Sequence, residues 1–345
     1  MANCSHSGRN TVCFPTDGHM EKELLILLRC ALWGEEIRPE EFSPDASHWE
    51  GILREAKQQE VAALCFEALG SVPQKCRPPR EVGAAWLVET ARSEKHHKLL
   101  HDIARAQHAS WERSGIKGLI LKGESVGQFY PRPERRTGGD IDWYFPSAAD
   151  WDKALEIARA AGCSPERDSD GDCHYLWNGA MIEHHRGWCL TATAATRKYL
   201  RGLEEQGYSD MDGIPILRPE VNLLMLNMHI LKHVLVKGVE LKQLCDYAMA
   251  LKALRGSYRP EDYRAAVKKC GLLKWTELLH CLVTSDLGLD KAHLPWPVEK
   301  RRSTATLLQT VWGAPFTKRF VLYMQYAPGE WFRRILGLII GRIKR

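Results

Sequence analysis

A change in the spacing of apolar residues near position 115 is the feature that most constrains the fold of this chain. Upstream, apolar residues recur with helical spacing over 21–34, 48–70 and 82–114. Downstream come short apolar runs bounded by glycine and proline, GLILKG (118–123) and IDWYF (141–145). Runs of this length are typical of strands. The chain therefore joins helix-only parts to a strand-containing part, which predicts an α+β fold.

A helix and a hairpin complete the strand-containing part. Ser147 and Asp150 form a capping box ahead of the helical segment ADWDKALEIARAAG, which Gly162 closes. The runs HYLW and AMIEHH flank Asn178-Gly179, the strongest short-range signal for a two-residue hairpin turn. Strand, helix, strand, helix and hairpin over roughly residues 115–190 predict a small mixed sheet.

Helical spacing returns after a helix at about 193–205 and a short strand at 214–217. Pro219 opens this last part, because proline is tolerated in the first turn of a helix. Four regions are therefore predicted: a flexible tail (1–19), an N-terminal helical region (20–114), a strand-containing core (115–218) and a C-terminal helical region with a basic amphipathic tail (219–345).

Charge, cysteine content and the length of apolar runs limit the partners and the compartment that we expect for this protein. Lys and Arg total 48 and Asp and Glu total 43, and the formal charge of +5 permits an anionic partner without requiring nucleic acid. The 11 cysteines include no CxxC pair, and no signal peptide is evident, so we expect reduced thiols in a cytoplasmic protein. The apolar run at 336–340 is far shorter than the roughly 20 residues of a membrane span, so no transmembrane segment is predicted.

Both ends of the chain carry features with more than one interpretation. Cys4, His6, Cys13 and His19 match no common zinc spacing, and we prefer a flexible tail to a metal site. The segment WFRRILGLIIGRIKR (331–345) mixes basic and apolar residues. It could lie on an anionic membrane surface or bind an anionic polymer such as a polynucleotide backbone. A final helix with a basic outer face is the alternative.

Two carboxylates stand close together in the sequence GGDIDW. On a strand, side chains two positions apart share a face, so Asp140 and Asp142 converge while Ile141 packs into the core. Like charges this close favour a bound cation, and oxygen ligands suit Mg²⁺ or Mn²⁺. A D-x-D pair alone is more often a solvated strand edge than a metal site, so its context decides.

The context supplies an anion site and a third acid. Lys122-Gly123 ends the preceding strand and leads into a helix whose first N–H groups favour an anion. Glu183 lies on the predicted hairpin strand AMIEHH, next to the strand of Asp140 and Asp142. Three acids on adjacent strands suit metal-assisted phosphoryl or nucleotidyl transfer.

The order of these motifs resembles the uncharacterised nucleotidyltransferase family of the DNA polymerase beta-like superfamily. The resemblance covers roughly residues 20–255 and rests on four motifs: Lys122-Gly123, R-x-x-x-D-I-D (136–142), Ile182-Glu183-His184, and a helix carrying His229 and His233 with a later Asp246. It implies an α+β fold with a small mixed β-sheet nucleotidyltransferase core flanked by N-terminal and C-terminal helical regions. Glu124 follows Gly123 where the superfamily has Ser or Gly.

The resemblance also implies a reaction and a set of site residues. Asp140, Asp142 and Glu183 would be the catalytic residues and would bind Mg²⁺ (or Mn²⁺), with Glu183 able to take the proton of the acceptor. Nucleotide-binding contacts would come from Lys122, Gly123, Ser125, Arg136 and Gly139. The protein would move a nucleoside monophosphate from an NTP, with ATP among the candidates, to an acceptor hydroxyl and release pyrophosphate.

Several histidines stand near these motifs. His229 and His233 have a spacing that can bind zinc, but HILKH lacks the Glu of HExxH and a third ligand. We therefore prefer to place them along an interdomain cleft. One of His184 and His185 is expected to border the site. The residues expected in the cleft are His184, His233 and Asp246.

The acceptor stays open at this point, with a small molecule, RNA or a protein hydroxyl all possible. One alternative function is a toxin-like enzyme that adds nucleotides to tRNA, which the mild positive charge and the basic tail favour. Another is a non-catalytic nucleotide-binding protein. The complete set of three acids argues against that second alternative.

Overall fold

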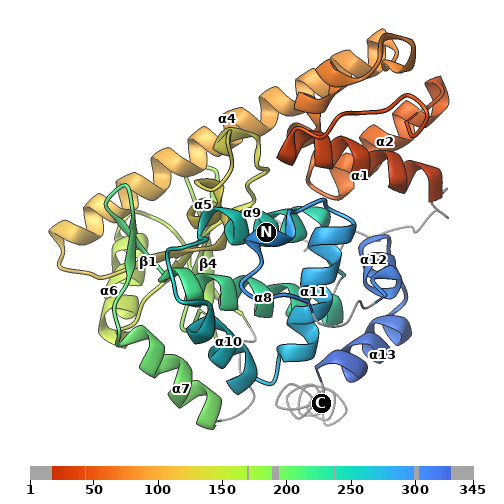
Figure 1. Ribbon diagram of the computed structural model, residues 1–345. Coiled ribbons are helices and arrows are strands. Elements are labelled where there is room, and N and C mark those ends of the chain that lie inside the picture. The colour runs from red at the N-terminus through yellow and green to blue at the C-terminus, as the bar shows by residue number, and fades with distance from the viewer. Residues whose placement is uncertain are drawn as a thin grey trace.

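Seven strands form one mixed sheet, and helices precede, cover and follow it (Figure 1). The computed structural model describes residues 18–42, 44–168, 171–188, 194–236, 238–298 and 303–327. The predicted α+β fold is confirmed. Cys4, His6, Cys13, the His19 side chain and the tail 331–345 lie outside the described residues, so the predictions for them stay predictions.

The helices before the sheet are α1 (Gly18–Trp33), α2 (Ala46–Gln58), α3 (Ala62–Cys65) and α4 (Arg80–Arg113), with short 3-10 turns at Phe66–Ser71 and Gln74–Cys76. The stretch 48–70 was expected to be one helical segment. Glu60 interrupts it with a positive φ of 56°. Helix α4 spans 34 residues and runs from the N-terminal helices to the sheet (Figure 1). Gly115, with φ 67°, follows its end as predicted.

The sheet has the order β3-β4-β5-β2-β1-β7-β6. Its strands are β1 (Leu119–Leu121), β2 (Asp140–Tyr144), β3 (Glu166–Arg167), β4 (Cys173–Trp177), β5 (Ala180–His185), β6 (Ser209–Met211) and β7 (Ile214–Ile216). The strand β2 is parallel to β5 and antiparallel to β1. The two acid-bearing strands are therefore direct neighbours, as predicted.

Local signals account for the turns around these strands. Asn178 and Gly179 have φ values of 49° and 87°, the positive pair that a type I′ hairpin turn requires. The Ser147 hydroxyl accepts a hydrogen bond from the Asp150 N–H and caps α6 (Ala148–Ala160). The second hydrogen bond of the predicted capping box would run from the Ser147 N–H to the Asp150 carboxylate. In the structure that carboxylate instead accepts from the Lys117 N–H at 3.3 Å.

The two faces of the sheet pack against different helices. On one face, Ile120, Ile141 and Trp143 share a buried core with side chains of α4 and α6. On the other face, Leu119 and Leu121 belong to a larger core that includes the helices after the sheet. Asp142 pairs with Leu121 in the ladder, so its side chain projects toward the second face.

The remaining helices are α5 (Lys122–Gly127), α7 (Ala194–Glu204), α8 (Pro219–Val236), α9 (Leu241–Ala253), α10 (Pro260–Lys269), α11 (Leu273–Ser285), α12 (Ala305–Val311) and α13 (Phe316–Tyr326), with 3-10 turns at Pro133–Arg135 and Lys291–His293.

His229, His233 and Asp246 were expected on one long helical stretch. Gly238, with φ 100°, separates α8 from α9 and donates its N–H to the His233 carbonyl at 2.8 Å. None of the described helices has the length and apolar content to cross a membrane. The predicted division at residues 114 and 218 stays a prediction.

Candidate active site

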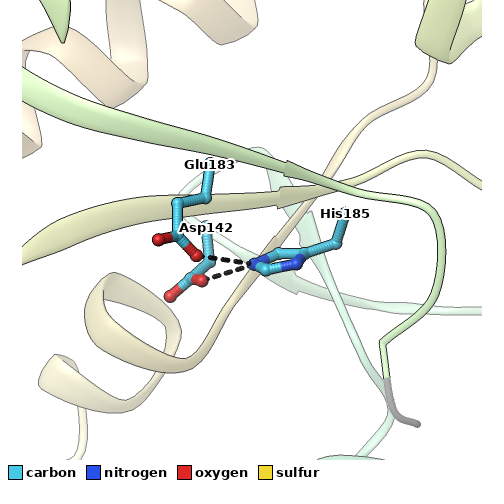
Figure 2. Close-up of side chains that lie close together, drawn as sticks. All are labelled: Asp142, Glu183 and His185. Atoms are coloured by element: carbon cyan, nitrogen blue, oxygen red, sulfur yellow. Dashed lines mark hydrogen bonds and ion pairs between the residues drawn. The ribbon is translucent and has the colours of Figure 1, made fainter. Parts of the chain in front are cut away.

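The parallel ladder between β2 and β5 places Asp142 directly opposite Glu183. Residues paired in a ladder project from the same face of the sheet. The next residue on that face of β5 is His185, two positions beyond Glu183. Figure 2 shows the three side chains of Asp142, Glu183 and His185 turned toward one another from these two strands.

These three residues form the cluster named here the acid–histidine cluster (Asp142, Glu183 and His185). Each offers one ligand atom, and these atoms all lie within 4.8 Å of one another. The His185 Nε2 is 2.6 Å from Asp142 Oδ1 and 3.4 Å from Glu183 Oε2 (Figure 2). Two carboxylate oxygens and one imidazole nitrogen therefore face a common point.

The positively charged side chain of Lys122 contacts the Asp142 carboxylate. Lys122 follows β1 directly and has φ 44°, a left-handed conformation that costs energy for a residue other than glycine. Its ammonium donates to Asp142 Oδ1 at 2.7 Å. Burial alone acts to raise the pKa of Asp142, but Lys122 and His185 outweigh it and hold that pKa well below its usual range. Asp142 is therefore an anion in this arrangement.

Asp140 lies one step along the same face of β2. The negative charge of Asp142, followed by burial, raises the pKa of the Asp140 carboxyl to about 6, against the lowering effect of Lys122. Glu183 acts in the same direction as Asp142. The repulsion among these three carboxylates is what a divalent cation would relieve, and an all-oxygen acid set suits Mg²⁺ or Mn²⁺. The residues present therefore fit the expected metal.

His185 is held from both sides by carboxylates. Its Nδ1 lies 2.7 Å from Asp172 Oδ2, on the side away from Asp142. Burial and the charge of Lys122 act to lower the pKa of His185. The hydrogen bonds to Asp142, Asp172 and Glu183 outweigh them and raise that pKa to about 10.

His184, which we expected among the cleft residues, does not line this face. It pairs with Trp143 and projects to the opposite side of the sheet, where it is fully buried. Its Nε2 lies 2.8 Å from the Tyr175 hydroxyl, and its ring meets that of Trp111 edge-on. Burial, followed by the charge of His185, lowers the pKa of His184 to about 3. The site histidine is therefore His185, and the prediction of His184 was wrong.

The residues expected to bind nucleotide differ in their placement. Gly139 is exposed, and no atom lies within 4 Å of the position that a Cβ would take there. Gly123 lies beside the acids, since a Cβ on it would be 3.5 Å from the Asp140 carbonyl. Ser125 is buried, and its hydroxyl donates to the Lys122 carbonyl at 2.9 Å. The Ser125 hydroxyl is therefore engaged within α5.

Arg136 is also engaged by the protein. Its Nε and one terminal nitrogen donate to the two oxygens of Asp246, each at 2.8 Å. Tyr130 donates its hydroxyl to the same carboxylate at 2.8 Å. Both members of the Arg136–Asp246 pair are buried. The structure thus joins the loop before β2 to α9, and it uses Arg136 for that contact.

His229 and His233 lie one turn apart on α8. The rings of His229 and His233 meet edge-on with centroids 4.4 Å apart. Burial lowers the pKa of His229 well below its usual range, and the charges of Lys122 and His233 act in the same direction. The charge of Asp142 opposes them, so His229 is within electrostatic reach of the cluster. The predicted cleft roles of His233 and Asp246 stay predictions.

Asp172 is a site residue that the motifs did not identify. It lies just before β4, outside every motif that we used. The signal was nevertheless present, because the Asn178-Gly179 turn fixes the hairpin register and pairs Cys173 with His184. One step further along that register places Asp172 opposite His185.

The chain is similar to one known protein family and to a solved structure. A family described as an uncharacterised nucleotidyltransferase matches residues 45–285, more than half of the chain. No curated protein matches. Among solved structures, the chain is similar to the Megavirus polyadenylate synthase, with 12% sequence identity and a TM-score of 0.33. That similarity covers 64% of this chain and 40% of that one, so the chain spans less than half of the viral protein.

Proposed function

The chain belongs to the uncharacterised nucleotidyltransferase family, and from this premise we propose that it transfers a nucleoside monophosphate from an NTP to an acceptor hydroxyl and releases pyrophosphate. The observation that carries the proposal is the pairing of Asp142 with Glu183 on adjacent strands, with Asp140 on the same face. Acids grouped in this way around the buried Asp142 favour a bound cation, and a metal-bound triphosphate supplies one.

Asp140, Asp142 and Glu183 are the residues that would hold Mg²⁺ or Mn²⁺. When bound, such ions neutralise charge on the triphosphate and make an acceptor hydroxyl more acidic. The side chain of Asp142 is 2% exposed, whereas that of Glu183 is 36% exposed. We therefore assign Asp142 to the interior of the site and Glu183 to the side from which the acceptor arrives.

The bond changes follow from that assignment. The acceptor oxygen forms a bond to the α-phosphorus as the bond from that phosphorus to the bridging oxygen of pyrophosphate breaks. Glu183 takes the proton of the acceptor hydroxyl, since its side chain is more exposed than that of Asp142. The pyrophosphate leaves with the electron pair of the broken bond.

Lys122 and the glycines serve the nucleotide in this proposal. The ammonium of Lys122 is held at Asp142 and lies beside the acids, so it can also meet a phosphate there. The open space around Gly139 allows the backbone to approach a nucleotide. Arg136, which is bound to Asp246, is assigned to positioning the loop before β2 instead of contacting phosphate.

The cell compartment is also part of the proposal. Eight cysteines have described side chains; none of these eight forms a disulfide, and six of them are buried. Buried cysteines that form no disulfide are compatible with a reducing compartment, so we propose a cytoplasmic protein.

The function is tested by offering the purified protein each α-labelled NTP with Mg²⁺ or Mn²⁺, together with cellular RNA, protein or metabolite fractions. We expect one fraction to become labelled by the wild type and not by Asp142→Asn. Asp210→Asn, a change on the exposed part of β6 in the same sheet, is the matched control and should label as the wild type does. Absence of wild-type labelling in every fraction would refute the proposal, and RNA labelling would identify the class of acceptor.

A further inference from the structure

We propose that His185 is a nitrogen ligand of the metal at this site and that Asp172 is the positioning residue that holds it there. The inference rests on the proposed function, because it concerns the same metal site. It goes beyond the three acids of that proposal by adding an imidazole to the ligand set and a supporting carboxylate behind it.

The orientation of the His185 ring carries the first step. Its Nδ1 lies 2.7 Å from Asp172 Oδ2, while its Nε2 lies 2.6 Å from Asp142 Oδ1. With Nδ1–H donated to Asp172, the nitrogen available to a metal is Nε2, which faces Asp142 and Glu183. Metal-bound histidines almost always donate their second ring N–H to a carboxylate, a backbone carbonyl or a water, and Asp172 is such a carboxylate.

Asp172 is itself anchored, which is the second step. Its Oδ1 accepts the Arg186 N–H at 2.9 Å, and its own N–H donates to Asp168 Oδ1 at 3.0 Å. The side chains of His185 and Asp172 are 12% and 19% exposed. The imidazole therefore has little freedom to turn away from the acids.

The third step is the convergence of two positive groups on one oxygen. Both the Lys122 ammonium and the His185 Nε2 contact Asp142 Oδ1. Positive charge therefore gathers at Asp142 Oδ1, and His185 Nε2 is the nitrogen that would meet a cation held there by the acids.

An imidazole in the ligand set has a consequence for metal choice. Carboxylates suit Mg²⁺ and Mn²⁺ alike, whereas nitrogen ligands favour the transition metals. The site should therefore bind Mn²⁺ more tightly than Mg²⁺, and the ratio of their dissociation constants should depend on His185.

The direct test is electron spin-echo envelope modulation of the full chain loaded with Mn²⁺, because this method detects nitrogen bound to the ion. We expect ¹⁴N modulation in the wild type and its loss in His185→Gln. His174→Gln is the matched control, since His174 lies on the same face of the sheet, opposite Glu183, and pairs with Glu166. The control should keep the nitrogen signal.

Variants of Asp172 test the positioning role separately. Asp172→Ala should weaken Mn²⁺ binding by about 10–100-fold, measured by titration calorimetry, as expected for loss of a group that orients a ligand. Asp172→Asn should recover part of that affinity, because its amide oxygen can still accept Nδ1–H. Both Asp172 variants should keep the wild-type circular dichroism spectrum.

The preference for Mn²⁺ over Mg²⁺, measured as the ratio of their dissociation constants, should fall in His185→Gln.

Failure of this inference differs from failure of the proposed function. If Mn²⁺ binds in a manner that Asp142→Asn abolishes, yet shows no ¹⁴N modulation, His185 is not a ligand and the three-acid site stands. If neither Mn²⁺ nor Mg²⁺ binds the wild type, both the inference and the metal site of the proposed function are overturned. Equal Mn²⁺ affinity in the wild type and Asp172→Ala would refute the positioning role.

Discussion

Arg136 and Asp246 form a buried two-point salt bridge between the loop before β2 and helix α9, with both nitrogen–oxygen distances at 2.8 Å. The two residues are 110 positions apart in the chain. Asp140 begins β2 only four residues after Arg136, so this contact fixes the strand that delivers the acids relative to the helices after the sheet. The pair therefore couples the geometry of the site to the packing of α9.

Breaking this pair on one side should destabilise the protein strongly. Asp246→Ala leaves the Arg136 guanidinium buried without its counter-charge, which costs about 3–5 kcal/mol. Urea denaturation measures the loss. The exposed pair Arg259–Glu261 is the matched control, at 4.0 Å with side chains 78% and 73% exposed. Glu261→Ala should cost less than about 1 kcal/mol.

A double variant separates the salt bridge from general packing. Replacing both partners, as Arg136→Met with Asp246→Leu, removes both buried charges together, so it should be less destabilising than Asp246→Ala alone. A double variant whose loss equals the sum of the two single losses would contradict the coupling.

Trp143 should matter for stability and not for metal binding. Its indole N–H donates to Gln107 Oε1 at 2.9 Å, and its ring meets Trp111 edge-on at 4.3 Å, on the face away from the acids. Trp143→Phe leaves the buried Gln107 acceptor without its donor, which costs about 1–3 kcal/mol. Thermal denaturation measures this cost, and Mn²⁺ titration of the folded variant should match the wild type. Weaker metal binding by the folded variant would contradict the assignment of the two faces.

A buried histidine should make the protein sensitive to acid. His280 is fully buried in α11 beside the Tyr247 hydroxyl, at 3.2 Å, and burial lowers its pKa from 6.5 to about 3. Its pKa is thus lower in the folded than in the unfolded state, so the unfolded state binds more protons between these two values. The contribution of His280 to the free energy of unfolding is therefore fully present above the unfolded pKa. It is lost as the pH falls below that value, by up to about 1.4 kcal/mol per pH unit.

Urea unfolding between about pH 6 and pH 4 tests this sign. His280→Gln removes the titrating group, so its free energy of unfolding should fall less steeply with decreasing pH than that of the wild type. The difference between the two slopes should correspond to about one bound proton. Identical slopes for the two proteins would show that His280 does not titrate on unfolding.

Much of the site followed from two local rules of the sequence. The period of two along a strand placed Asp140 and Asp142 on one face, and the predicted hairpin brought Glu183 beside them. The same rule should have selected His185, two positions after Glu183, instead of His184. The Asn178-Gly179 turn likewise fixed the register that sets Asp172 opposite His185.

Other features were not available from local pattern. The Arg136–Asp246 pair depends on how α9 packs against the core, which no spacing in the sequence encodes. The strands β3 and β6 have two and three residues, too few to show a period. The break between α8 and α9 at Gly238 had a local signal, since glycine tolerates φ 100°, but the apolar residues on both sides concealed it.

The central claim is that the acids of β2 and β5 direct nucleotidyl transfer, and it is tested most directly by following both halves of one NTP. The NTP carries one label on the α-phosphate and another on the γ-phosphate, and the acceptor is the fraction that the protein labels. We predict one pyrophosphate released for each α-labelled monophosphate transferred. Asp142→Asn should reduce both products by about 100-fold or more, because the site loses a metal ligand worth several kcal/mol. Asp210→Asn should change neither. Release of γ-label as phosphate without α-label transfer, or full activity of Asp142→Asn, would contradict the claim.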